Sequence, residues 1–251
     1  DTIHALGNPH IDTPHLDELV HAGSAFTRAI AAIPHCTPSR AEIMTGASGF
    51  LNRSPPFGRA MNPQLVLWAR TMRDAGYHAW YSGKWMNDGS PRTRGYEETS
   101  GLYSSGGAGE RDAVKFTHPR AHNGRPVTGY SGWTFKQSDG TPELDKGIGL
   151  TPTTDRHIAD GAIALLQRKP SKPFFLHVNF TAPHDPLHLP PGYERKYDPA
   201  NIPLPPNFLP QHPFDHGNAG QRDELLLDLP RDPQAVRTEI AAYYAVISHL
   251  D

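Results

Sequence analysis

The single cysteine of the chain, Cys36, lies where a helix is expected to begin. Thr37-Pro38-Ser39-Arg40 follows it, and the helical pattern runs on to Gly46. At a helix start, a thiol meets free backbone N–H groups and the positive end of the helix dipole, which favour a thiolate or another developing anion. Arg40 adds a fixed positive charge one turn later. The pattern predicts an activated nucleophile beside an anion site; the alternative is a buried, inert cysteine.

Two further residues follow segments that read as strands. Lys84 comes after the run 77–82 and a glycine, so its ammonium is expected at a strand end, where it can serve as a point charge for an anionic oxygen. His184 comes directly after the apolar run 174–180, which is typical of a strand buried in a parallel sheet. Because α/β folds place their sites at the carboxyl ends of parallel strands, His184 is a candidate general acid. Without other signals, Lys84 would more often be a surface lysine, and His184 a histidine packed in a loop.

The segment from Cys36 to Gly46 resembles the signature of the type I sulfatases at every defining position, Cys-x-Pro-Ser-Arg and then Thr-Gly. The resemblance implies that Cys36 is oxidised to formylglycine. One hydroxyl of the hydrated aldehyde then attacks sulfur, and the other expels sulfate as the aldehyde re-forms. It also implies that a formylglycine-generating enzyme reads Pro38 and Arg40 during maturation, and that Arg40 stabilises the modified side chain.

The segment 76–85 resembles a second signature of the same family and implies that Lys84 binds the sulfate group. The family has a His after Trp85 that hydrogen-bonds the formylglycine, whereas this chain has Met86. A thioether cannot donate a proton or take the proton of the second hydroxyl. The departure predicts impaired deprotonation of the hydrate, unless His35 or His78 substitutes.

The segment Pro183-His184-Asp185-Pro186 resembles the family motif Pro-His-x-Pro. It implies that His184 protonates the leaving oxygen or binds sulfate, and His188 is a further candidate for substrate contact. His177, inside the expected strand, is interpreted as a hydrogen-bonded core residue. The family also binds calcium or a similar divalent ion, which suits hard oxygen ligands. Of that ligand set only the formylglycine from Cys36 is expected here, with the other ligands outside these residues.

The elements that position these residues follow from periodicity and from helix start and stop signals. Thr13 is expected at an N-cap, with Pro14 at the first helical position. Expected helices span 13–23, 36–46, 65–75, 153–168 and 234–251, expected strands span 77–82 and 174–180, and 24–33 reads as a strand or extended segment.

The order helix, loop, strand occurs twice and predicts a layered α/β fold. The resemblance makes this an alkaline-phosphatase-like α/β/α domain with a mostly parallel sheet, incomplete at both ends. Residues 1–251 are interpreted as part of a single sulfatase catalytic domain, in which 87–150 and 185–234 are loop-rich insertions.

The composition of the 251 residues is ordinary for a soluble protein, with 37% hydrophobic and 20% charged residues. A net charge of −2 gives no argument for nucleic acid or an anionic membrane. No apolar run approaches the roughly 20 residues that span a bilayer, so no membrane span is expected. One cysteine excludes an internal disulfide and a cysteine-based zinc site. Family habit implies a periplasmic or secreted protein.

The expected activity is hydrolysis of a sulfate ester on a small molecule or an oligosaccharide, with sugar sulfates favoured because the two loop-rich stretches could build an extended subsite. Two alternatives stay open. The protein could be a phosphate or phosphonate monoester hydrolase of the same superfamily, or a catalytically impaired relative that binds sulfated glycans. Because most metal ligands are expected elsewhere, the 251 residues alone are expected to be inactive.

Overall fold

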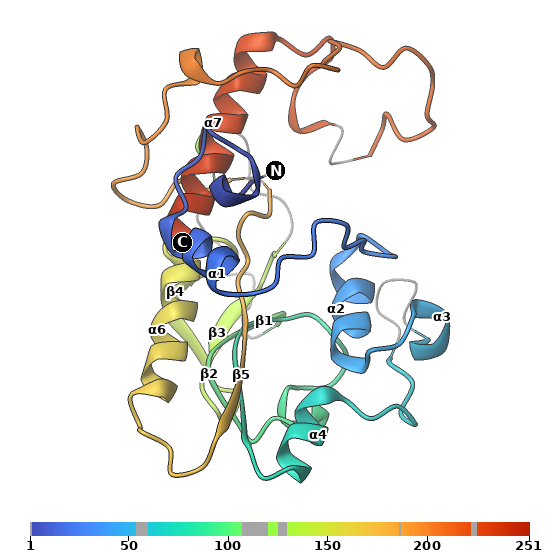
Figure 1. Cartoon of the computed structure of the whole chain (residues 1–251), viewed down its shortest axis with the longest axis vertical. Coiled ribbons are helices and arrows are strands. Elements are labelled where there is room, and N and C mark those ends of the chain that lie inside the picture. The colour runs from blue at the N-terminus through green and yellow to red at the C-terminus, as the bar shows by residue number, and fades with distance from the viewer. Residues whose placement is uncertain (1, 54–59, 107–119, 125–129, 186, 222–224) are drawn as a thin grey trace. The chain divides into compact units, whose positions relative to one another are not determined.

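The computed structural model describes residues 2–53, 60–106, 120–124, 130–185, 187–221 and 225–251. They form two compact units. The first unit comprises Asp1–Thr27, Pro119–Val127 and Ala182–Asp251, and the second comprises Arg28–His118 and Thr128–Thr181. Figure 1 shows the order of the elements along the chain.

The second unit is built on a five-stranded sheet in the order β4-β3-β2-β1-β5. Its strands are β1 (His78–Trp85), β2 (Glu98–Ser104), β3 (Thr134–Lys136), β4 (Pro142–Ile148) and β5 (Phe174–Asn179). The central strand β1 pairs in parallel with β2 on one side and with β5 on the other. β3 and β4 extend the sheet in antiparallel fashion. The carboxyl ends of β1, β2 and β5 therefore meet at one edge of the sheet.

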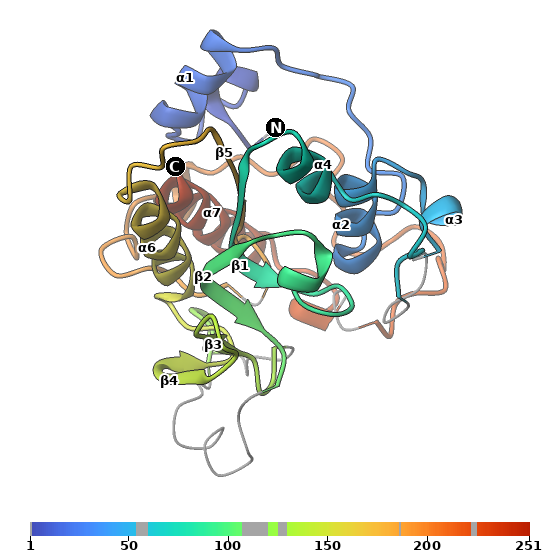
Figure 2. The same cartoon turned by 90° about the horizontal axis from the view of Figure 1, so that it is seen from below.

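Helices cover both faces of this sheet, as Figure 2 shows. The helix α6 (Thr154–Leu166) packs on one face, against β1, β2 and β5. On the other face, α4 (Trp68–Asp74) packs against β1, and α2 (Cys36–Thr45) lies beside α4 and the short α3 (Gly49–Asn52). These layers confirm the predicted α/β fold.

The side chains of β1 divide between the two layers, as the two-residue period of a strand requires. Ala79, Tyr81 and Trp85 belong to the buried cluster that also contains residues of α2 and α4. Ser82, on the opposite face, donates a hydrogen bond of 2.8 Å to the carbonyl of Ile158 in α6. The strand that leads to Lys84 is thus fixed from both sides.

The predicted helices and strands of this unit are found, with four main differences. β1 runs on to Trp85 rather than ending at residue 82. α4 begins at Trp68 rather than at residue 65. Residues 24–33 form no strand; their course is irregular, with a turn at 27–28 and bends at 32–33. The described part of 87–150 supplies a short 3-10 helix, η2 (Arg92–Arg94), and three strands of the sheet itself, rather than loops around it. The sequence of β2 gave no signal of this, because Glu98 to Ser104 has neither an apolar run nor regular alternation.

The first unit contains η1 (His4–Leu6), α1 (Pro14–Ala22), η3 (Pro199–Asn201) and α7 (Pro233–Leu250). Buried residues of this unit lie on α7 and also on other segments, among them Ile11, Leu187 and Ile202. The buried residues of α7 are Ala241, Ala242, Ala245, Val246, Ile247 and Ser248. The remaining described residues of 185–234 are irregular, as predicted.

The start of α1 is capped from the other end of the chain. Thr13 occupies the predicted N-cap position, but its side chain makes no capping hydrogen bond. The carboxylate of Asp251 instead accepts hydrogen bonds from the backbone N–H groups of His15 (3.2 Å) and Leu16 (2.7 Å). These are two of the donors that a helix start leaves without an intrahelical acceptor. The first unit is therefore closed by a contact between residues more than 200 positions apart.

Candidate active site

Cys36 is the first residue of α2, as predicted, and it is partly exposed. Two hydrogen bonds hold this helix start against the segment that follows β1. The hydroxyl of Thr37 donates to the carbonyl of Met86 (3.5 Å), and the amide of Asn87 donates to the carbonyl of Thr37 (3.1 Å). Cys36 therefore lies beside the carboxyl end of β1, with the positive end of the α2 dipole behind it.

Lys84, near the end of β1, is not the surface lysine that its sequence alone would favour, because only 2% of it is exposed. Its ammonium donates a hydrogen bond to the hydroxyl of Tyr130 and lies 4.7 Å from the centre of that ring. Burial lowers the pKa of Lys84 to about 8, and the charge of Arg40 acts in the same direction, whereas Cys36 and Asp155 raise it. The structure thus brings Cys36, Arg40 and Lys84 into one electrostatic cluster.

Asp155 is the carboxylate of this cluster, and no sequence motif marks it. It lies in the first turn of α6. It accepts hydrogen bonds from the backbone N–H (2.6 Å) and the hydroxyl (3.0 Å) of Thr181, which follows β5. An acidic residue in a first helical turn is so common that it marked nothing in advance. Tyr130, the partner of Lys84, had no sequence signal either.

His177, on β5, is a partly buried, hydrogen-bonded residue, in line with its interpretation as a structural histidine. Its Nδ1 accepts from the hydroxyl of Tyr96 (2.6 Å), which in turn accepts from the indole N–H of Trp68 (2.9 Å). Its Nε2 donates to the side-chain oxygen of Asn179 (3.0 Å). Burial lowers the pKa of His177 to about 4, and the charge of Arg40 also lowers it, while the bond to Asn179 opposes the shift. The ring is therefore neutral at pH 7, with its proton on Nε2.

The same chain of hydrogen bonds ends at the backbone of Lys84. The amide of Asn179 donates to the hydroxyl of Tyr81 (2.6 Å), and that hydroxyl donates to the carbonyl of Lys84. Between them, Gly83 has a φ of +102°, and a Cβ there would lie 2.0 Å from the carbonyl oxygen of Asn179. Side chains from β1 and β5 thus fix the backbone that presents Lys84.

Of the two histidines proposed to replace the one missing at position 86, the structure excludes His78. It begins β1 and is hydrogen-bonded to Glu97 (3.0 Å). Six residues of extended strand, about 20 Å, separate it from Lys84, so it lies toward the opposite end of the strand. His35, the residue before Cys36, stays a candidate by its position at the N-cap of α2.

His184 and His188 belong to the first unit. Nδ1 of His184 donates to the carbonyl of Asp185 (2.6 Å), because a carbonyl can only accept. Pro183 and Asp185, on either side of His184, line a cavity of about 320 Å³ within this unit. We call it the Glu239 cavity.

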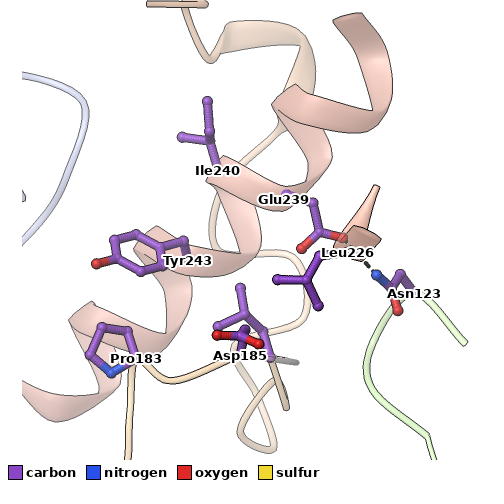
Figure 3. A pocket seen from close by; sticks show the side chains of 8 residues that line it. Asn123, Pro183, Asp185, Leu226, Glu239, Ile240 and Tyr243 are labelled. Carbon is purple, nitrogen blue, oxygen red and sulfur yellow. Dashed lines mark hydrogen bonds between the residues drawn. The ribbon is translucent and has the colours of Figure 1, made fainter. Parts of the chain in front are cut away.

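Glu239, Ile240 and Tyr243 of α7 lie around the Glu239 cavity together with Pro183, Asp185, Leu226 and Asn123, as Figure 3 shows. Glu239 is held by the amide of Asn123 (2.7 Å) and by Nε2 of His122 (3.2 Å). The described lining residues are Asn123, Pro183, Asp185, Leu187, Leu226, Glu239, Ile240 and Tyr243. They include two carboxylates and no lysine or arginine.

The metal ion that the resemblance implies has no complete ligand set here. Among the described residues, no group of three or more His, Cys, Asp or Glu side chains is arranged to hold a metal. The residues present therefore do not fit a calcium site by themselves. The formylglycine from Cys36 remains the one ligand predicted from this chain.

The family profile described as Sulfatase matches residues 1–251. An arylsulfatase of Clostridium perfringens is 28% identical over 100% of this chain and 54% of its own length. An ulvan-active sulfatase of Formosa agariphila is 28% identical over 87% of this chain and 39% of its own length. The chain thus spans about half the length, or less, of these curated relatives.

Similar folds occur among solved structures. A phosphonate monoester hydrolase of Agrobacterium radiobacter has a TM-score of 0.65 at 18% identity, over 100% of this chain and 54% of that one. A protein solved with its substrate D-glucosamine-2-N,6-O-disulfate has a TM-score of 0.60 at 23% identity, over 82% of this chain and 36% of that one. These likenesses support the alkaline-phosphatase-like fold. Since the family profile covers every residue, the helix that begins at Cys36 included, the chain belongs to the sulfatase family.

Proposed function

We propose that the protein hydrolyses sulfate esters, with a formylglycine made from Cys36 as its nucleophile. The observation that supports this best is the cluster at the carboxyl edge of the sheet. There Cys36 begins α2, and the charges of Arg40 and buried Lys84 act on each other. Sulfate transfer needs such an arrangement, because negative charge builds up on the sulfate oxygens as the ester bond breaks.

The roles of the side chains follow from their chemistry. One hydroxyl of the hydrated formylglycine attacks sulfur, and the alcohol of the ester leaves. Arg40 and Lys84 bind the sulfate oxygens as cations. His184 gives a proton to the leaving oxygen from Nε2, since its Nδ1 is bound to a backbone carbonyl. Loss of the proton from the second hydroxyl then expels sulfate and restores the aldehyde. His35 is the candidate to accept this proton in place of a histidine at position 86.

Sulfated carbohydrates are the proposed substrates, and aryl sulfates would report the same chemistry. The relative from Formosa agariphila is named an ulvan-active sulfatase, and one protein of similar fold was solved with a disulfated glucosamine as its substrate. Among the described helices, none is both long and apolar enough to cross a bilayer. We further propose maturation by a formylglycine-generating enzyme, and export to the periplasm or the medium.

Mass spectrometry of the peptide that contains Cys36 tests the proposal directly. In full-length protein produced together with a formylglycine-generating enzyme, conversion lowers the peptide mass by about eighteen daltons. Cys36→Ala is expected to reduce hydrolysis of an aryl sulfate on the order of a thousandfold or more, with the fold retained. Turnover of the aryl sulfate by protein whose Cys36 is an unmodified thiol would contradict the mechanism.

The same assay separates the two alternatives. Phosphonate monoester hydrolases share this fold, so relative rates on sulfate, phosphate and phosphonate esters decide between the activities. For a catalytically silent glycan-binding protein, Met86→His would bring no gain in turnover while sulfated glycans still bind. For a working sulfatase, the wild type turns over the sulfate ester and Met86→His raises the rate or leaves it unchanged.

A further inference from the structure

A second cavity, of about 450 Å³, lies entirely within the second unit, beside the carboxyl ends of β1 and β2. We call it the Lys136 cavity. Thr37 and Met86 line it, so it borders the residue that follows Cys36 and the residue that follows β1. Its volume is within the range of ligand-binding pockets, roughly 300–1,000 Å³.

The charge of the Lys136 cavity points to an anionic ligand. Lys136 is the one charged side chain among the described residues that line it, and none of these is a carboxylate. The ammonium donates to the carbonyl of Ser105 (2.8 Å), its one hydrogen-bond partner in the part of the chain that the structure describes. An ammonium has three donors, so the other two are available to a ligand. Burial lowers the pKa of Lys136, and a bound anion would compensate this loss of hydration.

The uncharged walls combine apolar and hydrogen-bonding groups. Trp85, Trp133 and Met86 supply ring and thioether surface, while Ser104 and Asn87 supply a hydroxyl and an amide. A pyranose presents apolar C–H faces together with hydroxyl groups, so it matches such a mixed surface. The Glu239 cavity makes the contrast clear, because its two carboxylates would repel a sulfated sugar.

Lys136 is separate from the cluster proposed to bind the scissile sulfate. The charges that act on Lys84 are those of Arg40, Cys36 and Asp155, and Lys136 is not among them. The cavity therefore offers a place for a second anion that is distinct from the first, and Thr37 and Met86 connect it to the surroundings of Cys36.

We propose that the Lys136 cavity is a subsite for a sugar that carries a second anionic group, a sulfate or a carboxylate, beside the ester that is cleaved. Lys136 is its specificity-determining residue. This inference rests on the proposed sulfate ester hydrolysis. It places the protein among enzymes that act on polyanionic carbohydrate, and it predicts that a substrate without the second anion loses affinity rather than reactivity.

The test uses the full-length protein in which Cys36 has been converted to formylglycine. Its substrates are pyranosides with one or two sulfate groups or a uronate, and a small aryl sulfate for comparison. Lys136→Met keeps the length of the side chain and removes its charge, and Lys136→Arg restores a cation. Lys146→Met is the matched control, because Lys146 lies on the neighbouring strand β4, is paired with Glu143 (2.9 Å) and does not line the cavity. Thermal melting verifies that each variant folds.

Lys136→Met is expected to raise KM at least about tenfold for the doubly anionic sugars and to leave kcat unchanged. The hydrolysis of the small aryl sulfate should also be unchanged. Lys136→Arg should recover most of this loss, and Lys146→Met should change nothing. Equal losses on all substrates, or no preference of the wild type for a second anion, would overturn the subsite.

Calorimetry measures the binding of these sugars to the Cys36→Ala variant, with and without Lys136. This measurement tests the subsite independently of sulfate ester hydrolysis. If the second anion strengthens binding only when Lys136 is present, the subsite stands even without turnover of any sulfate ester. If the wild type hydrolyses sulfate esters but binds singly and doubly anionic sugars equally, the subsite fails and the proposed function stands.

Discussion

The two units of this chain each contain a cavity of a few hundred cubic ångströms, and the two cavities have opposite charge. The Lys136 cavity has one lysine and no carboxylate among its described lining residues, whereas the Glu239 cavity has two carboxylates and no lysine or arginine. A pocket near a candidate catalytic residue is therefore not enough to place an anionic substrate. The positive charge of Lys136 makes the Lys136 cavity the more favourable of the two for an anionic substrate.

The units also differ in how their polar groups are fixed. In the second unit, a directional chain of hydrogen bonds runs between neighbouring strands and ends at the backbone of Lys84. In the first unit, decisive contacts join distant parts of the sequence, such as Asp251 with the start of α1 and Asn123 with Glu239. We therefore expect the stability of the second unit to depend on contacts between its strands. The stability of the first unit should depend on single capping contacts.

The largest expected effect comes from Gly83→Ala, measured against Gly76→Ala. Both glycines have positive φ, so both substitutions introduce backbone strain of about 1–2 kcal/mol. At Gly76 a Cβ meets nothing within 4 Å, whereas at Gly83 it meets the carbonyl of Asn179 at 2.0 Å. Gly83→Ala should therefore lower the free energy of unfolding by about 4 kcal/mol or more, because the strands must separate. Equal losses for the two variants in denaturant titration would show that the strand contact is not limiting.

Asn179→Ala tests the hydrogen-bond chain between the strands. It removes the acceptor of the Nε2–H of His177 and the donor to Tyr81, leaving two interior groups without these partners. The expected loss of unfolding free energy is about 3–4 kcal/mol. Asn201→Ala, at an exposed position in the first unit, is the control and should change the free energy of unfolding little. A loss below 1 kcal/mol for Asn179→Ala, roughly that of one solvated hydrogen bond, would speak against a chain that fixes Lys84.

The pH dependence of stability should report His177. Its pKa is about 4 in the folded state and 6.5 in its ordinary state, so between these values the unfolded chain binds the proton more readily. Stability from this group is thus present above pH 6.5 and is lost as the pH falls toward 4, by at most about 3 kcal/mol. His177→Gln should flatten this part of the curve of unfolding free energy against pH. His78→Gln, which alters the half-exposed ring bound to Glu97, should leave it in place.

The smallest effect is expected at the cap of the first unit. Asp251→Ala removes the acceptor from the start of α1 and should destabilise that helix by about 1–2 kcal/mol. Hydrogen exchange of the α1 backbone amides is the measurement, since it reports local opening. Amides of β1 in the second unit should exchange as in the wild type. Faster exchange there would mean that the two units do not respond independently.

Much of the second unit could be predicted from local sequence. The start of α2 at Cys36, the helix α6 and the strands β1 and β5 follow from periodicity and stop signals. β2 could not, since Glu98 to Ser104 lacks an apolar pattern and becomes a strand only by pairing with β1. His78 was wrongly included as a substitute, because it begins the strand whose carboxyl end holds Lys84.

The sequence by itself determined the family signature, the nucleophile candidate Cys36 and the charged partners Arg40 and Lys84, because these depend on residue type and on short-range spacing. Only the tertiary structure decided that Lys84 is buried against Tyr130, that Asp155 joins the cluster, and that Lys136 faces a cavity whose described lining residues include no carboxylate. The reason is physical. Burial, the interaction between charges and the net charge of a cavity lining arise from groups that are far apart in the chain. These groups meet only when the sheet and its helices pack.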